Sequence, residues 1–295
     1  MADLKVGAED EKRVKGLGFL RNRGTDCFSA RIITTNGKIT AEQARCISEA
    51  AERFGNGTVT ITGRMTIEIP GVPYENIEAF RAFIRQAGLE TGGTGAKVRP
   101  VVCCKGTTCR YGLIDAFSLS EEIHQRFYKG YGDVKLPHKF KIAVGGCPNN
   151  CVKPNLNDVG IIGQLVPDFD EAACRGCKKC AIEKLCPVQA ALLKDGKLAI
   201  DREKCLNCGL CAGKCPFGAV TGGLTGYKIY IGGRWGKHIS HGIPLRKIFA
   251  SREEALAVLE RALFFYRDHG QPGERFAQTI ARIGFETVEA ALLGE

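Results

Sequence analysis

Eight cysteines between residues 174 and 215 fall into two runs that share one spacing. The runs are CRGCKKCAIEKLCP and CLNCGLCAGKCP, each with three cysteines separated by two residues and a later Cys-Pro pair. The whole chain has 15 cysteines. Clustered thiols in a reducing compartment usually bind metal rather than form disulfides. The spacing therefore predicts iron–sulfur chemistry, and iron–sulfur clusters carry single electrons.

The two runs resemble those of bacterial two-cluster ferredoxins. In that pattern three closely spaced thiolates bind one 4Fe–4S cluster, and the distant Cys-Pro cysteine binds the other. The resemblance implies one cluster on Cys174, Cys177, Cys180 and Cys215, and a second on Cys205, Cys208, Cys211 and Cys186. The first run departs from the pattern because five residues separate its last two cysteines. The alternative is structural zinc, which favours two separated C-x2-C pairs.

Another group of cysteines lies in CCKGTTC and GGCPNNC, each after strand-like sequence. These are Cys103, Cys104, Cys109, Cys147 and Cys151. Four thiolates on two loops can close one more 4Fe–4S cluster. The pairing resembles the signature of sulfite and nitrite reductases that carry a sirohaem coupled to a 4Fe–4S cluster. In that family the last cysteine, here Cys151, bridges the cluster to the haem iron.

Two alternatives stay open for this group. Cys103 gives the family's five-residue spacing to Cys109, whereas Cys104 places Gly106 two residues on, as in related loops, and we favour Cys104. The group as a whole is alternatively a zinc site or a set of buried structural thiols. Cys27 and Cys46 have no cysteine nearby and are expected in the core.

Cations accompany these cysteines. Residues 97–153 contain ten Lys or Arg against four Asp or Glu. Sirohaem carries eight carboxylates, and sulfite and nitrite are anions, so their cavity needs several cations. By resemblance, the family's substrate-binding positions are Arg99, Lys139, Lys141 and Arg31. Candidates for the sirohaem carboxylates are Arg64, Lys97, Arg110, Lys153, Arg234 and Lys237. For each of these cations the alternative is a solvated surface side chain.

Strand alternation places Lys139 and Lys141 on one face with Phe140 opposite, so both ammonium groups can point at one ligand. Preorganised cations polarise an oxygen that must leave as water and can relay protons to it. We therefore expect these cations to bind substrate and to assist its protonation.

The elements that position these residues follow from periodicity and capping signals. Thr40 and Gln43 predict a capping box for a helix that Gly55 ends. Alternation in TVTITGRMTIEIPG predicts a strand pair, and PYENIEAFRAFIRQAGL a second helix, which gives a βαββα unit over residues 28–90. Strand-like alternation returns in GYKIYIGGRWGKH, and Ser251 with Glu254 predicts another helix start.

We predict an α+β fold: a sulfite/nitrite reductase half-repeat with an inserted bacterial-type ferredoxin domain carrying two 4Fe–4S clusters. The expected domains are a ferredoxin-like βαββα domain (residues 1–90), the first part of a sirohaem and 4Fe–4S catalytic domain (91–167), the ferredoxin insert (168–222), and the second catalytic part with C-terminal helices (223–295). The Gly-rich stretch TGGTGAKVRP is a hinge or loop between the halves.

Composition restricts the function classes. The chain of 295 residues begins with charged sequence and has no apolar run of membrane-span length, so a soluble, cytoplasmic protein without a membrane partner is expected. The net charge of +10 comes without an arginine-rich tract, which disfavours nucleic acid.

The resemblance implies a sulfite reductase of an anaerobe, an enzyme that reduces sulfite to sulfide with six electrons. Its cofactors would be sirohaem and three 4Fe–4S clusters. No nucleotide-binding signature is present, so electrons would come from a ferredoxin or from a flavin- or NADH-oxidising subunit. A single half-repeat suggests a homo-oligomer or a hetero-complex. The alternatives are nitrite reduction to ammonia and a non-catalytic electron-transfer protein.

Overall fold

The computed structural model describes residues 6–295. Contacts divide the chain into two compact units. Unit 1 comprises Met1–Cys103, Ser120–Ile142 and Glu260–Glu295, and unit 2 comprises Cys104–Leu119 and Ala143–Leu259. Within residues 6–295, no helix is both long enough and apolar enough to cross a membrane.

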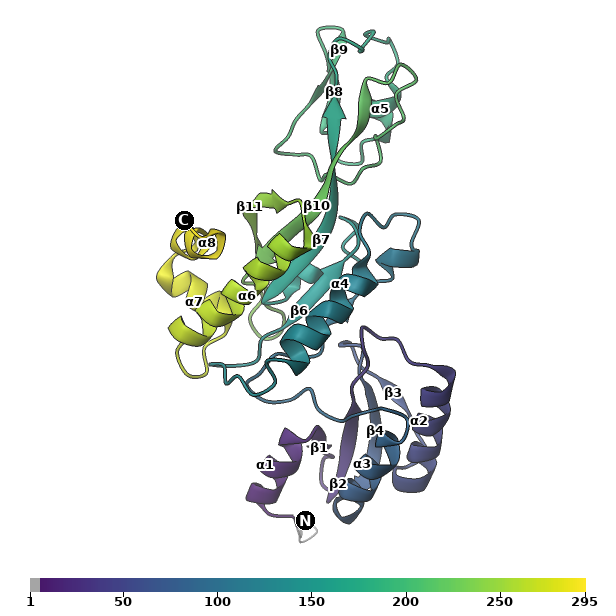
Figure 1. The fold of residues 1–295 in the computed structure, drawn as a ribbon, viewed down its shortest axis with the longest axis vertical. Helices are drawn as coiled ribbons and strands as arrows, with labels where there is room; N and C mark the ends of the chain where they lie inside the picture. The colour runs from purple at the N-terminus through teal and green to yellow at the C-terminus, as the bar shows by residue number, and fades with distance from the viewer. Residues whose placement is uncertain (1–5) are drawn as a thin grey trace. The chain divides into compact units, whose positions relative to one another are not determined.

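Unit 1 contains a four-stranded antiparallel sheet (Figure 1). Its order is β1 (Phe19–Arg21), β2 (Cys27–Ile32), β4 (Ile67–Pro73) and β3 (Thr60–Ile61). Its N-terminal helices are α1 (Ala8–Gly16), α2 (Ala41–Phe54), a 3₁₀ turn (Tyr74–Asn76) and α3 (Ile77–Arg85). The predicted βαββα unit corresponds to β2, α2, β3, β4 and α3. It is preceded by α1 and β1, which no sequence pattern had predicted.

Local signals explain why the helices begin and end where they do. The Thr40 hydroxyl accepts from the Gln43 N–H at 3.1 Å and the Gln43 side chain accepts from the Thr40 N–H at 3.0 Å, which is the predicted capping box. Gly55 follows α2 as its C-cap. Phe80 of α3 is fully buried, with its ring centroid 5.8 Å from that of Phe19 and 6.0 Å from that of Phe54. Aromatic packing therefore fastens both helices to the sheet.

The C-terminal helices are α6 (Arg252–His269), α7 (Phe276–Ile283) and α8 (Phe285–Leu293). The Glu254 N–H donates to the Ser251 hydroxyl at 3.1 Å as expected, but the Glu254 carboxylate accepts from the Ala250 N–H rather than from Ser251. Upstream, α4 (Ala116–Ile123) continues into a π-helical stretch, His124–Lys129. In unit 1 the fully buried Phe140 ring packs against Tyr266 and Phe276.

A second sheet has the order β11 (Ile243–Phe249), β10 (Val220–Ile231), β7 (Val159–Phe169), β6 (Ile142–Gly145) and β5 (Val102–Cys103). Two 3₁₀ turns, Gly106–Thr108 and Pro154–Leu156, lie in the loops beside it. The mixture of sheets and helices confirms the predicted α+β class.

Between β7 and β10 the chain forms a small lobe (Figure 1). It contains α5 (Ala181–Leu185) and a hairpin of β8 (Ala191–Lys194) and β9 (Lys197–Ile200). Since β7 and β10 pair antiparallel over Val159–Phe169, the lobe leaves and re-enters the sheet at neighbouring positions. This is the segment in which the sequence predicts a ferredoxin insert.

Candidate functional site

Four cysteine thiols of unit 2 lie close together on two loops. Burial raises the pKa of the Cys147 thiol, and the neighbouring thiols of Cys104, Cys109 and Cys151 raise it further. The Cys104 sulfur accepts a hydrogen bond from the Gly146 N–H at 3.1 Å. Cys151 is exposed, whereas the other three are half-buried. The set therefore has one thiol that faces outward.

Two glycines bring these loops into contact. A Cβ atom on Gly106 would lie 2.7 Å from the Gly146 Cα atom, and one on Gly146 would lie 2.6 Å from the Gly106 Cα atom. Any side chain at either position would push the loops apart. The backbone approach is therefore what allows cysteines more than 35 residues apart in the sequence to share one space.

Cys103 has different surroundings. It is 1% exposed within β5, and its N–H donates to the Met65 sulfur at 3.5 Å. Cys104, the next residue, belongs to the thiol set around Cys147. The structure thus brings Cys104 next to Cys147 and buries Cys103 within β5.

In the lobe, a second thiol set surrounds Cys211. Burial raises the pKa of the Cys211 thiol, and the Cys205, Cys208 and Cys186 thiols add to this rise. The same four cysteines line an almost wholly apolar cavity with Leu185, Val188, Ile200 and Leu210. This grouping is the crossed one expected from the sequence, with Cys186 from the first run among cysteines of the second.

Three of the remaining lobe cysteines pack against a small core that Cys186 and Cys211 also contact. Ile182, Ala191, Leu198 and Val220 are its buried members. Cys174, Cys180 and Cys215 pack against it. Hydrogen bonds from the Leu198 and Gly176 backbones lower the pKa of the Cys174 thiol, which favours the thiolate form that binds metal.

Among residues 6–295, no group of three or more His, Cys, Asp or Glu side chains is close enough to hold a single metal ion. The thiol sets above are defined instead by shared burial and mutual electrostatic influence.

The loop of the Cys211 set contacts the sheet of unit 2 directly. The Leu165 N–H of β7 donates to the Asn207 carbonyl at 2.8 Å, and Leu165 forms a parallel bridge with Cys208. A Cβ atom on Gly209 would lie 2.8 Å from Leu165 Cδ2 and 3.4 Å from Leu113 Cδ2. The backbone of this cysteine loop therefore packs against both leucines.

From Leu113 the contacts continue to the first thiol set. The Leu113 N–H donates to the Gly146 carbonyl at 2.8 Å. The Gly146 N–H in turn donates to the Cys104 sulfur. A short series of contacts thus connects the two thiol sets within unit 2.

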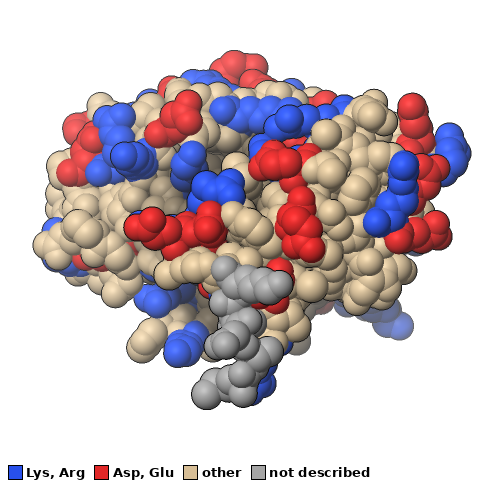
Figure 2. Space-filling model, turned by 90° about the horizontal axis from the view of Figure 1, so that it is seen from below, with Lys and Arg blue, Asp and Glu red and all other residues tan. Residues whose placement is uncertain are grey.

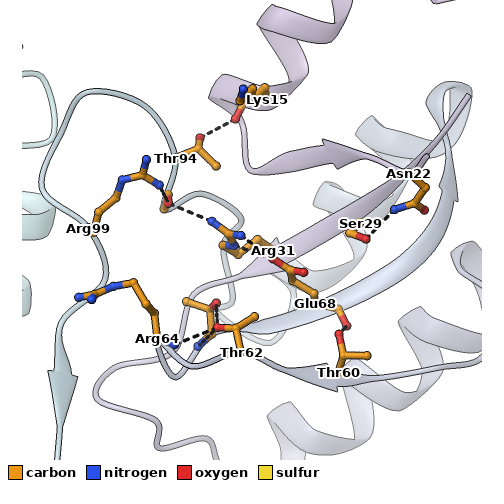
Figure 3. Close-up of polar contacts among 12 residues, drawn as sticks. Lys15, Asn22, Ser29, Arg31, Thr60, Thr62, Arg64, Glu68, Thr94 and Arg99 are labelled. Atoms are coloured by element: carbon orange, nitrogen blue, oxygen red, sulfur yellow. Dashed lines mark hydrogen bonds and ion pairs between the residues drawn. The ribbon is translucent and has the colours of Figure 1, made fainter. Parts of the chain in front are cut away.

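Two of the cations expected to bind substrate meet in unit 1 (Figure 3). Arg31 Nη1 donates to the Gly93 carbonyl at 3.2 Å, and Arg99 Nη1 donates to the same oxygen. Arg31 also forms an ion pair with Glu68, with Nη2 2.6 Å from Oε1. Burial, together with the charges of Arg31 and Arg275, lowers the pKa of Arg99 to about 10. Positive charge is therefore concentrated around Gly93.

The two lysines of the KFK segment lie on strand-like backbone. The Phe140 N–H donates to the Lys97 carbonyl at 3.0 Å, and the Arg99 N–H donates to the Phe140 carbonyl at 2.8 Å. Phe140 is buried and the flanking Lys139 and Lys141 are half-buried, as the alternation predicts. This pairing places three predicted site residues, Arg99 and the two lysines, on adjacent segments.

The six candidate carboxylate ligands have varied surroundings. Arg64 donates to the Pro100 carbonyl at 2.5 Å and to the Ile142 carbonyl at 3.2 Å, so much of its guanidinium binds backbone. The exposed Arg110 stacks on the Tyr111 ring at 4.8 Å. Lys97 lines a cavity in unit 1. Lys153 and Lys237 are exposed and Arg234 is half-buried, all three in unit 2.

The sequence analysis missed Arg275 and Tyr128. Arg275 is 4% exposed and its charge acts on Arg99, although it lies 176 positions further along the chain. Tyr128 forms a hydrogen bond with the Gly93 backbone. No local motif marks either residue, so only the tertiary structure reveals them.

The geometry agrees with sequence comparison. Residues 94–295 match the family described as "Nitrite and sulphite reductase 4Fe-4S domain", and residues 21–87 match "Nitrite/Sulfite reductase ferredoxin-like half domain". The chain belongs to the nitrite and sulphite reductase family. The suspected family resemblance is thereby confirmed.

Similar proteins of this family include sulfite reductases. The coenzyme F420-dependent sulfite reductase of Methanocaldococcus jannaschii is 30% identical over 93% of this chain and 42% of its own length. One subunit of the anaerobic sulfite reductase of Salmonella typhimurium is 29% identical over 66% of this chain and 58% of its own length. The chain thus spans about half the length of these relatives.

A solved structure with the same fold is that of dissimilatory sulfite reductase I. It matches with a TM-score of 0.72 and 22% identity, over 91% of this chain and 69% of that one. The match supports the reductase half-repeat as the fold of this chain.

On the face of the molecule seen in Figure 2, Lys and Arg side chains are interspersed with Asp and Glu side chains. This mixed surface has the charge pattern of an ordinary protein surface rather than that of a phosphate-binding stripe.

Proposed function

We propose that this chain reduces sulfite to sulfide in a six-electron reaction, using a sirohaem coupled to a 4Fe–4S cluster. The observation that carries the proposal is the meeting of Cys104, Cys109, Cys147 and Cys151 on two glycine-packed loops. Four thiols in one place suit a 4Fe–4S cluster. The exposed position of Cys151 supports it as the bridge to the haem iron.

Two further clusters belong to the proposal, held by the lobe as an inserted ferredoxin. The apolar cavity lined by Cys186, Cys205, Cys208 and Cys211 supports one of them. The proposed ligands of the other are Cys174, Cys180 and Cys215, which pack on the small core of the lobe, and Cys177. Bound at these sites, the clusters would supply single-electron transfer.

The chain's own cations would bind and protonate the anion. Arg31, Arg99, Lys139 and Lys141 are the proposed substrate-binding residues. Half-buried ammonium and guanidinium groups attract an oxyanion more strongly than solvated ones, because less water screens them. Each sulfite oxygen leaves as water, so the lysines would hold protons near the departing oxygen. The carboxylates of sirohaem would be bound by Lys97, Arg110, Lys153, Arg234 and Lys237. Arg64 belongs to this proposed set as well, although its backbone hydrogen bonds give it a second role.

Electrons would be delivered from the lobe to the thiol set around Cys147, which includes Cys104. The contacts through Leu113 and Gly146 support this route, because they connect the Cys211 set with the thiol set around Cys147. The donor would be a ferredoxin or a flavin- or NADH-oxidising partner subunit. The lobe presents exposed Arg175, Lys178, Lys179 and Lys184, which favour an acidic partner. A cytoplasmic location and a homo-oligomeric or hetero-complex assembly complete the proposal.

The experiment that tests this function is the absorption spectrum of anaerobically purified protein before and after sulfite is added, with the pigment extracted for identification. Sirohaem bands that shift with sulfite are expected. Steady-state turnover with sulfite and with nitrite then separates sulfite reduction from the alternative of nitrite reduction to ammonia. Iron–sulfur absorption without a tetrapyrrole, in protein from a host that makes sirohaem, would favour the electron-carrier alternative instead.

A further inference from the structure

Gly93 is held through its backbone by side chains from distant parts of unit 1. Its carbonyl oxygen accepts from Arg31 Nη1 and from Arg99 Nη1 (Figure 3). The Tyr128 hydroxyl interacts with the Gly93 backbone on the other side. The Tyr128 hydroxyl also lies 2.8 Å from where a Cβ atom on Gly92 would stand. The phenol therefore packs directly against the Gly92–Gly93 backbone.

The backbone at Gly93 requires glycine. Its φ is +73°, and a Cβ atom there would lie 2.9 Å from Pro100 Cγ and 3.1 Å from Ile33 Cδ1. A left-handed residue with no side chain can turn its carbonyl toward two guanidinium groups at little steric cost. The same freedom means that the direction of the carbonyl must be fixed by its neighbours.

The Tyr128 ring is itself well fixed. It belongs to the π-helical stretch His124–Lys129, a backbone form often found at functional sites. The buried His124 ring stacks on it, with centroids 4.9 Å apart and an interplanar angle of 27°. Burial raises the pKa of Tyr128 to about 12, so the phenol stays protonated and neutral at physiological pH. A neutral, rigid hydroxyl is a suitable anchor for a flexible glycine.

The arginines need such an anchor because they repel each other. Arg99 is half-buried and lies near the charges of Arg31 and Arg275. The Gly93 carbonyl is the acceptor that the Arg31 and Arg99 guanidinium groups share, so its direction sets where both can point. A small rotation of this residue would move two substrate-binding cations at once.

We propose that Tyr128 is a positioning residue for the anion site. Its hydroxyl fixes the Gly93 backbone, whose carbonyl in turn orients the guanidinium groups of Arg31 and Arg99. This inference rests on the proposed function, in which these two arginines bind the sulfite anion.

The test is Tyr128→Phe, with Tyr131→Phe as the matched control. Tyr131 follows the same π-helical stretch, but its hydroxyl donates to Glu260 instead. We expect Tyr128→Phe to weaken sulfite binding roughly two- to tenfold, as for the loss of one hydrogen bond. Sulfite binding is measured by the shift of the haem absorption bands, and Tyr131→Phe should bind like wild type.

Two further measurements separate positioning from a general structural role. Carbon monoxide binding to the reduced haem needs no cation, so its affinity should stay unchanged in Tyr128→Phe. Haem and iron contents should also stay at wild-type values. Wild-type sulfite affinity in Tyr128→Phe, an equal loss of carbon monoxide affinity, or an equal effect of Tyr131→Phe would overturn the role. Wild-type protein without a haem would refute the proposed function itself, and with it the role of Tyr128.

Discussion

The adjacent cysteines Cys103 and Cys104 provide a matched pair of substitutions for the proposed cluster beside the haem. Cys104→Ala removes a thiol that accepts a hydrogen bond from Gly146 and lies in the set around Cys147. Cys103→Ala removes a sulfur that is 1% exposed within β5. The two variants differ by one position in the chain but should differ completely in cofactor content.

The expected magnitudes follow from these surroundings. Cys104→Ala should lose one cluster, so that iron, which includes the one atom of the sirohaem, falls from about thirteen to about nine atoms per chain, or to about eight if the haem leaves with the cluster. The haem bands that depend on the bridge through Cys151 should be lost with it. Cys103→Ala should keep all of its iron and instead lose about 1–2 kcal/mol of unfolding free energy, because only a small buried group is deleted. For a chain of this size that corresponds to a fall in Tm of about 2–8 °C.

The assay is iron and acid-labile sulfide content per chain on anaerobically purified protein, with thermal unfolding measured on the same samples. Iron loss in Cys103→Ala with full iron in Cys104→Ala would refute the assignment of Cys104. Full iron in both variants would show that neither cysteine is an essential ligand, and the proposed four-thiol site would then be wrong.

Two further predictions concern the contacts through Leu113 and Gly146 that connect the two thiol sets, and the buried His124. Leu113→Ala should slow electron transfer from the lobe clusters to the haem-linked cluster several-fold, measured by rapid mixing with sulfite, at unchanged iron content. The control is a substitution of Leu210, which lines the lobe cavity, to alanine. Equal electron-transfer rates in the two variants would contradict a route through Leu113. Burial lowers the pKa of His124 from 6.5 to about 4, so below pH 6.5 the unfolded chain binds a proton that the folded chain refuses. Stability should therefore be complete above pH 6.5 and fall by about 3 kcal/mol as the pH drops toward 4. Denaturant unfolding of His124→Phe across this range should show a flatter profile, and an unchanged profile would exclude His124 as the cause.

The proposed cluster-binding cysteines could be predicted from the sequence because most of them come in short runs. Within a run such as Cys205 to Cys211, covalent spacing alone brings the thiols together. Spacing could not decide between Cys103 and Cys104, which are adjacent in the chain. The distinction comes from the end of β5: Cys103 is the last strand residue and is buried, and the next residue turns into the loop that meets Gly146. Which of the two cysteines faces the loop depends on where β5 ends, and the end of β5 is set by the sheet rather than by the cysteine spacing.

The cation site was predictable only in part, for a different physical reason. The family resemblance predicted Arg31 and Arg99 as substrate-binding residues, but the sequence could not show that both bind one carbonyl oxygen or that Glu68 neutralises part of the charge on Arg31. Buried like charges are tolerated only where nearby acceptors compensate them, and such acceptors come from anywhere in the fold. Here the compensation comes from a glycine carbonyl, and the residue that fixes that glycine, Tyr128, lies in a π-helical turn that has no sequence signature. The charged residues of this site can therefore be predicted from the sequence, whereas the residues that orient them, such as Tyr128, can be found only in the folded structure.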